Sequence, residues 1–274
     1  MGVLLALLAA AAWGTGDYSG GLAMRRLQQW QVLLLSAGSG AAALVVCVAL
    51  TGERAAPGPW VLWALVAGTG VALGVTTLYA SIARGDVTTV APTAAVVTAA
   101  VPVAYGVVVH GMPSAVTLVG FLAAGVGIWL VAQAGGGAHG NVRAARDGVV
   151  AGCGFGSFLV LIGFASAGGV YLPVLVGRAG VMLGAIVLMR HAGQPVPSVR
   201  GHGSALLAGV LDATGNALYV VAQRHARLDV AAVLASLYPV ATVALAWWRD
   251  GERLSRLQWA GAALCLAAVV LIPG

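Results

Sequence analysis

The chain has little charge and no lysine. Of its 274 residues, 8% are charged and 60% are hydrophobic, whereas a soluble domain typically has about 25% charged residues. All 14 basic residues are arginines. The composition therefore argues against an ordinary soluble domain and predicts an integral membrane protein that has the lipid bilayer as a partner.

The distribution of the arginines argues against nucleic-acid binding. Most lie in short polar gaps between apolar runs, so the net charge of +6 describes the flanks of membrane segments. We expect no nucleic-acid partner.

Reactive and metal-binding motifs are also missing from the sequence. Cys47, Cys153 and Cys265 stand singly in apolar runs, where cysteine is typically a small packed hydrophobic residue. There is no P-loop, H-E-x-x-H motif or nucleophile elbow. We therefore expect no metal, no cofactor and no catalytic residues, and we predict that the protein is not an enzyme.

What the sequence does contain is a series of long apolar runs. A bilayer core of about 30 Å requires about 20 apolar residues in a helix, and ten runs of this kind are separated by turns rich in glycine, proline and charge. The predicted spans are 3–23, 30–50, 60–82, 88–109, 114–133, 147–166, 170–189, 203–223, 229–248 and 256–272. We predict an all-α membrane protein with ten transmembrane helices.

The second half of the chain resembles the first at a shift of about 140 residues, at which Gly14 and Gly16 match Gly154 and Gly156. Because each half has an odd number of helices, the two halves must cross the membrane in opposite directions. The prediction is two inverted five-helix repeats, a fold that typically places a substrate near the bilayer midplane. The predicted parts are a first repeat over 1–135, a linker over 136–146 and a second repeat over 147–274.

Asp17 lies deep within the first predicted helix, about 20 Å from its start at 1.5 Å per residue. An ionised acid at a helix centre costs about 2.5 to 3.5 kcal/mol even on mild scales, so such a residue faces a cavity or a partner. We expect it to bind substrate or couple transport to protons. The alternatives are a neutral acid bonded to a neighbouring helix, or a shifted span.

The segment 203–223 places four polar residues on one helical face. Asp212, Asn216, Tyr219 and Gln223 follow one another at spacings of four, three and four residues. This stripe is expected to face a wet cavity rather than lipid, and the alternative is a buried hydrogen-bond network between helices.

Arg178 stands near the middle of the seventh predicted helix, at a depth compatible with that of Asp212. We predict a structural ion pair between them. The residues predicted to bind substrate or to take part in coupling are Trp13, Asp17, Tyr79, Asp212, Asn216, Tyr219 and Ser236.

Several stretches together resemble the drug/metabolite transporter superfamily, and specifically its EamA-type ten-helix transporters. They are "WG" in the first segment, "LYASIARGDVTTVAPTAAVVTAAVPV", "LYVVAQRHARLDVAAVLASLYPVATVAL" and "GERLSRLQWAGAALCLAAVVLI". Pro239, Gly251 and Glu252 fit the family's pattern of a proline followed by a Gly-Glu turn, whereas the first half has "HGMPS" there. The resemblance implies an exporter of small metabolites or amphipathic compounds that works by alternating access.

The polar residues leave a second class of function open. An intramembrane enzyme or lipid-handling protein would use Asp17 and Asp212 for acid and base chemistry, which requires both groups within reach of one substrate atom. On the predicted spans, the two acids differ in depth by roughly 6 to 10 Å, counted at 1.5 Å per residue. This difference disfavours the second class.

The arginines also predict an orientation in the membrane. Ten lie in loops after odd-numbered segments and three in loops after even-numbered segments. The positive-inside rule then places both termini outside the cytoplasm, whereas the family resemblance implies cytoplasmic termini. We follow the charges and expect a multi-pass protein of the inner (plasma) membrane with extracytoplasmic termini.

Overall fold

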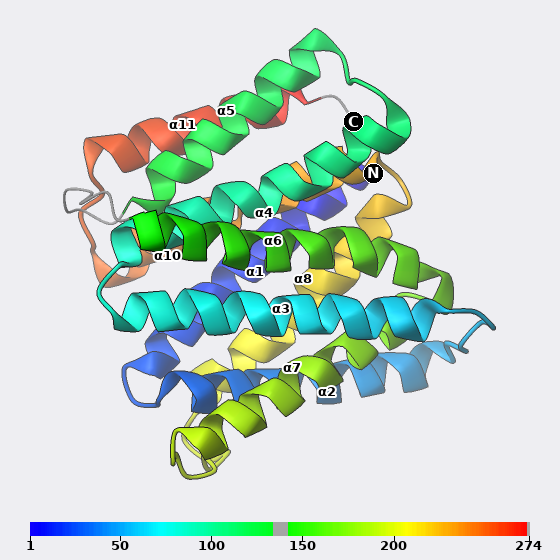
Figure 1. The fold of residues 1–274 in the computed structure, drawn as a ribbon, viewed down its shortest axis with the longest axis vertical. Coiled ribbons are helices and arrows are strands. Elements are labelled where there is room, and N and C mark those ends of the chain that lie inside the picture. The colour runs from blue at the N-terminus through cyan, green and yellow to red at the C-terminus, as the bar shows by residue number, and fades with distance from the viewer. Residues whose placement is uncertain (134–141, 273–274) are drawn as a thin grey trace.

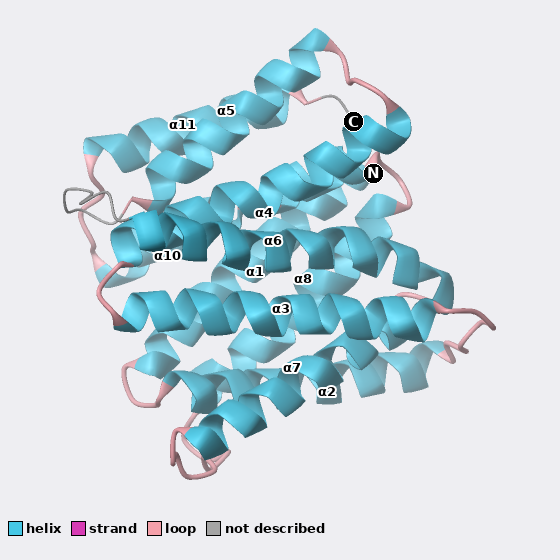
Figure 2. Cartoon of the chain, in the orientation of Figure 1, coloured by secondary structure: helices cyan, strands magenta, loops and turns pink. Residues whose placement is uncertain are grey.

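The computed structural model describes residues 1–133 and 142–272, and in this part of the chain every regular element is a helix (Figures 1 and 2). The first half contains α1 (Gly2–Met24), α2 (Gln29–Thr51), α3 (Trp60–Ala83), α4 (Val87–His110) and α5 (Ala115–Ala132). The second contains α6 (Val142–Ala165), the 3₁₀ turn η1 (Ser166–Gly168), α7 (Tyr171–His191), α8 (Gly203–Gln223), α9 (Leu228–Ala235), α10 (Tyr238–Asp250) and α11 (Arg256–Leu271).

Within the described residues, eight helical segments are long and apolar enough to cross a membrane, with α9 and α10 counted together. The chain is therefore a multi-pass membrane protein. Length and composition establish eight of the ten expected spans: α11 has only 16 residues, and α1 is not among the eight.

Two predicted segments differ in detail from the helices of the structure. The ninth predicted helix, 229–248, is divided into α9 and α10 at Ser236 and Leu237, because Pro239 has no N–H to donate to the carbonyl of Ala235. The sixth begins at Val142, so the predicted linker contributes its last five residues to α6. The remainder of that linker, 136–141, lies outside the described residues.

The helix packing follows a pattern of exchange between the two halves. α1 packs on α8 and α3 packs on α6, while α2 contacts α7 and α5 contacts α11. If α9 and α10 are counted as one helix, each helix of the first half has a counterpart five places along the chain, so that α1 corresponds to α6 and α3 to α8. Replacing each helix by its counterpart turns the α1–α8 pair into the α3–α6 pair. The α2–α7 and α5–α11 pairs each consist of two counterparts and stay the same. Glycine contacts show the relative direction of α5 and α11. Gly120 lies against Ile272 and Gly127 against Gly261, so the two helices are antiparallel.

The successive helices alternate in direction, which gives the bundle two ends. We call the end with the loops after α1, α3, α7 and α10 the arginine-rich face, and the opposite end, with the N-terminus and the loops after α2, α4, α6 and α8, the arginine-poor face. In Figure 1 the arginine-rich face is on the left and the arginine-poor face on the right.

Glycines allow the helix backbones to approach closely. At the crossing of α5 and α11, a Cβ atom on Gly127 would lie 2.6 Å from the Cys265 Sγ atom and 2.8 Å from the Gly261 carbonyl oxygen. Gly125, two residues earlier on α5, has open space around it. Alanine substitutions at Gly127 and Gly125 therefore distinguish the effect of lost close packing from the effect of a higher helix propensity.

We predict that Gly127→Ala destabilises the protein by about 1–3 kcal/mol, the usual cost of overpacking, because the Gly261 backbone cannot move aside. The matched control, Gly125→Ala, should leave stability unchanged or raise it by up to about 1 kcal/mol. Thermal denaturation in detergent measures both. Equal losses from the two variants would show that the α5–α11 contact does not depend on Gly127.

Candidate functional site

A central cavity of about 450 Å³ lies between the two halves. Its walls come from α1, α2, α3, α4, α6, α7 and α8 and from the junction of α9 and α10. It extends from residues near the middle of the helices, such as Trp13 and Thr98, to Met24 and Val32 near the arginine-rich face. The cavity thus connects the middle of the bundle with one face.

Asp17 is exposed to this cavity and belongs to a lining face of α1 that also includes Trp13, Gly20 and Gly21. Within residues 1–133 and 142–272, no hydrogen bond or ion pair to the Asp17 carboxylate is found. The Asp17 carboxyl group is therefore available to contact a molecule bound in the cavity.

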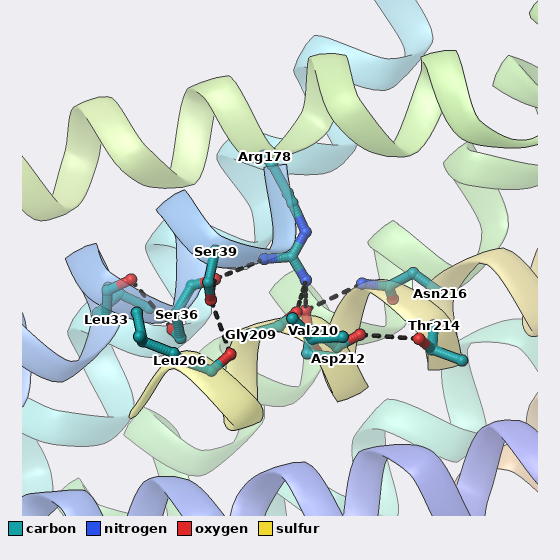
Figure 3. A network of polar contacts seen from close by, with 10 residues as sticks. All are labelled: Leu33, Ser36, Ser39, Arg178, Leu206, Gly209, Val210, Asp212, Thr214 and Asn216. Carbon is teal, nitrogen blue, oxygen red and sulfur yellow. Dashed lines mark hydrogen bonds and ion pairs between the residues drawn. The ribbon is translucent and has the colours of Figure 1, made fainter. Parts of the chain in front are cut away.

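Arg178 lies at the centre of a polar cluster formed by α2, α7 and α8 (Figure 3). Its guanidinium group forms an ion pair with Asp212 and donates hydrogen bonds of 3.3 Å to the Ser36 and Gly209 carbonyl oxygens. The Asn216 side-chain amide donates to Asp212 at 3.1 Å. The Arg178 side chain is only 8% exposed, whereas that of Asp212 is 51% exposed, so Arg178 anchors the helices and Asp212 faces the cavity.

Two glycines make room for this guanidinium group. A Cβ atom on Gly40 would lie 2.5 Å from the Arg178 Nη1 atom, and one on Gly209 would collide with the Ser36 carbonyl. The Ser39 hydroxyl then donates to the Leu206 carbonyl at 2.8 Å, which joins α2 to α8. Close backbone packing and burial of the guanidinium group therefore depend on each other.

The predicted polar stripe of α8 serves two purposes. Asp212 and Asn216 line the cavity. The Tyr219 hydroxyl and the Gln223 amide instead donate to the Leu159 carbonyl of α6, at 3.0 and 2.7 Å. The stripe thus combines both alternatives, a cavity wall in its first half and a network between helices in its second.

Aromatic rings form the rest of the predicted site. The Trp13 ring centroid lies 5.7 Å from that of Tyr219, which is fully buried and stands behind the cavity wall, and 6.4 Å from that of Tyr238, which lines it. Tyr79 lines the cavity and contacts Trp30 edge-on at 5.8 Å.

Ser236 lies at the break between α9 and α10 and also lines the cavity. It is only 2% exposed, and its hydroxyl has no hydrogen-bond partner among the described residues. The structure therefore brings six of the seven predicted binding or coupling residues to one cavity. The exception is Tyr219.

The difference in depth predicted for the two acids was wrong. A Cβ atom on Gly16, the neighbour of Asp17, would lie 3.6 Å from the backbone nitrogen of Asp212, so the acids stand at similar levels. The prediction counted residues from each helix end and ignored the offset between α1 and α8.

Sequence reasoning also missed the contribution of α6 to the wall, since Phe155 and Phe158 look like ordinary apolar residues of a span. It missed Glu53 as well, whose carboxylate caps α7 from the loop after α2. No group of three potential metal ligands occurs within the described residues.

Comparison with known proteins places the fold among solved structures. One crystal structure, 18% identical in sequence, superposes with a TM-score of 0.75 and covers 98% of this chain and 95% of its own. At this identity the likeness shows a shared fold. No curated protein sequence matches the chain.

The family comparison concerns the second half of the chain. Residues 148–273 match the model of the EamA-like transporter family. The resemblance to the drug/metabolite transporter superfamily is thereby confirmed, and residues 148–273 carry it.

Proposed function

We propose that the protein is a secondary active transporter that exports small metabolites or amphipathic compounds by alternating access. In this proposal, ten transmembrane helices form two inverted five-helix repeats, 1–135 and 147–274. The exchange of helix pairs between the halves supports the inversion, as do the antiparallel contacts of α5 with α11. The family match spans nearly the same residues as the second repeat.

The observation that carries the proposal is the central cavity, which is walled by both halves and whose lining, among the described residues, extends from the middle of the bundle to the arginine-rich face. A substrate bound between two halves can be released on the other side when the halves rock against each other. The aromatic and aliphatic lining suits a compound with an apolar body.

The charges of the cavity limit the kind of substrate. Arg178 and Asp212 neutralise each other, whereas Asp17 has no basic partner among the described residues. The cavity therefore favours a small neutral, zwitterionic or cationic solute over one with several negative charges. Trp13 and Tyr238 offer aromatic faces for a cationic group.

We further propose that Asp17 couples export to protons. A carboxylate that faces each side of the membrane in turn can load and release one proton per cycle. Asp212 is less suited to this role because Arg178 and Asn216 hold its carboxylate.

The rival function, an intramembrane enzyme or lipid-handling protein, gains one supporting observation, which is that Asp17 and Asp212 line one cavity at similar levels. Acid and base catalysis requires two groups free to exchange protons with one substrate atom. The ion pair of Asp212 with Arg178 argues against that freedom.

One prediction of this proposal concerns Asp17. Asp17→Asn keeps the shape and hydrogen bonding of the side chain but cannot exchange a proton, so it should insert normally and lose uptake driven by a pH gradient. The assay uses proteoliposomes and a labelled substrate chosen by thermal-shift screening, which detects ligands without assuming a direction. Asp212→Asn is the comparison and should keep pH dependence. Wild-type rate and pH dependence in Asp17→Asn would refute the coupling role.

The second prediction concerns orientation in the plasma membrane. If the positive-inside rule applies, the arginine-rich face is cytoplasmic and both termini are extracytoplasmic. In a cysteine-free background, Ala55→Cys on the arginine-poor face should react with an impermeant maleimide in intact cells. Val199→Cys, exposed on the other face, should react only after permeabilisation. The reverse pattern would place the termini in the cytoplasm.

A further inference from the structure

The helices α2 and α7, counterparts in the two halves, end in the same way. α2 is followed by Gly52 at φ 63° and then Glu53, and α7 is followed by Ala192, Gly193 at φ 64° and then Gln194. The shift from Gly52 to Gly193, 193 minus 52, is 141 residues. An acid in one half thus corresponds to its neutral amide in the other.

Glu53 joins the two halves at the arginine-poor face. Its carboxylate accepts hydrogen bonds from the backbone N–H groups of Val170, Tyr171 and Leu172, at 2.8, 2.9 and 2.8 Å. These groups belong to the start of α7, where N–H groups lack partners within the helix and the helix dipole favours negative charge. The contact holds the end of α2 against the start of α7 at the face that the central cavity does not reach.

Gln194 occupies the corresponding place at the arginine-rich face, beside the start of α2. The carbonyl of its neighbour Pro195 accepts a 2.8 Å hydrogen bond from the Gln31 side chain in the first turn of α2. The Gln194 Oε1 atom is buried and has no hydrogen-bond partner among the described residues.

The first turn of α2 is closed by its own residues in this conformation. The side chains of Gln28 and Gln31 bond each other's backbone N–H groups, with 3.0 Å between the Gln28 nitrogen and Gln31 Oε1. At the 141-residue shift, the three N–H groups that Glu53 binds correspond to those of Gln29, Trp30 and Gln31. The Gln194 Oε1 atom, which has no donor among the described residues, therefore lies beside the first turn of α2. This turn is the counterpart of the start of α7, which Glu53 caps.

We propose that Glu53 and Gln194 are alternate latches of the transport cycle, a proposal that rests on alternating access. With the cavity open to the arginine-rich face, Glu53 caps α7, and the Gln194 Oε1 atom has no partner among the described residues. When the halves rock to the opposite state, Glu53 leaves α7 and Gln194 accepts N–H groups from the first turn of α2. Both are positioning residues and neither contacts the substrate.

The two latches are unequal in strength. A carboxylate at a helix start forms charge-assisted hydrogen bonds, which are roughly twice as strong as those of a neutral amide. The chemistry of Glu53 and Gln194 therefore biases the protein toward the state that opens at the arginine-rich face. Exchanging acid and amide should change this bias.

The test measures the separation of α2 and α7 at the arginine-poor face. Nitroxide labels on Ala55→Cys and Ala167→Cys, both exposed and in opposite halves, are introduced after alanine replaces the native cysteines. Pulsed electron paramagnetic resonance in lipid nanodiscs, in acidic and alkaline buffer, then gives the ratio of long to short distances. Glu252→Gln, an exposed acid outside the latches, is the matched control.

Glu53→Gln should raise the ratio of long to short distances about tenfold, the effect of replacing a charge-assisted bond by a neutral one. Gln194→Glu should raise it as well, whereas Gln194→Ala should lower it and Glu252→Gln should leave it unchanged. Gln194→Ala removes an acceptor that has no partner in this conformation, so its result stands even if Glu53→Gln fails to fold.

Two other outcomes would overturn the proposal in different ways. If the wild-type protein shows both distances but neither Gln194 variant changes their ratio, the latches are refuted and alternating access stands. A single distance in the wild-type protein and in all variants, in both buffers, would refute alternating access and the latches with it.

Discussion

Burial of the Arg178 guanidinium group is the constraint around which the centre of the bundle is organised. A buried charge is tolerated only when it is paired and hydrogen-bonded, and here the partners of Arg178, which lies on α7, come from two other helices, α2 and α8. Gly40 and Gly209 are required for the same reason, since a side chain at either position would displace the guanidinium group or its acceptors. The cluster joins α2, α7 and α8 near the middle of the bundle and presents one face of Asp212 to the cavity.

The two halves share a framework but differ in chemistry. Their helices pack in exchangeable pairs, yet Arg178 and Asp212 occur in the second half and Asp17 in the first. The cavity between them therefore has one neutralised pair of charges and one acid, Asp17, that has no partner in the described part of the chain. In the proposed alternating-access transporter, the shared framework would supply two conformations, and the unequal side chains would decide which substrate and which conformation are favoured.

The helices could be predicted from the sequence because runs of about 20 apolar residues carry a strong signal in a membrane protein. The break at Ser236 was not predicted, although the sequence has a proline, Pro239, three residues later. Pro92 and Pro102 lie within an unbroken α4, so a proline alone does not say where a helix divides. The roles of Tyr219 and Glu53 depend on acceptors and donors supplied by distant segments, which no local pattern reveals.

The division of the ninth span also separates two different environments. From Asp229 to Ala235, every residue of α9 is buried, whereas α10 has no buried residue. Since Pro239 cannot donate to the Ala235 carbonyl, fewer backbone hydrogen bonds cross the junction than in a continuous helix. The two residues at the break thus join a segment that is buried in the core to one that packs on α1 and α5 without a fully buried residue. A rotation there would displace the far end of α10, together with Asp250 and its contacts to Arg25 and Tyr18, and would leave α9 in place.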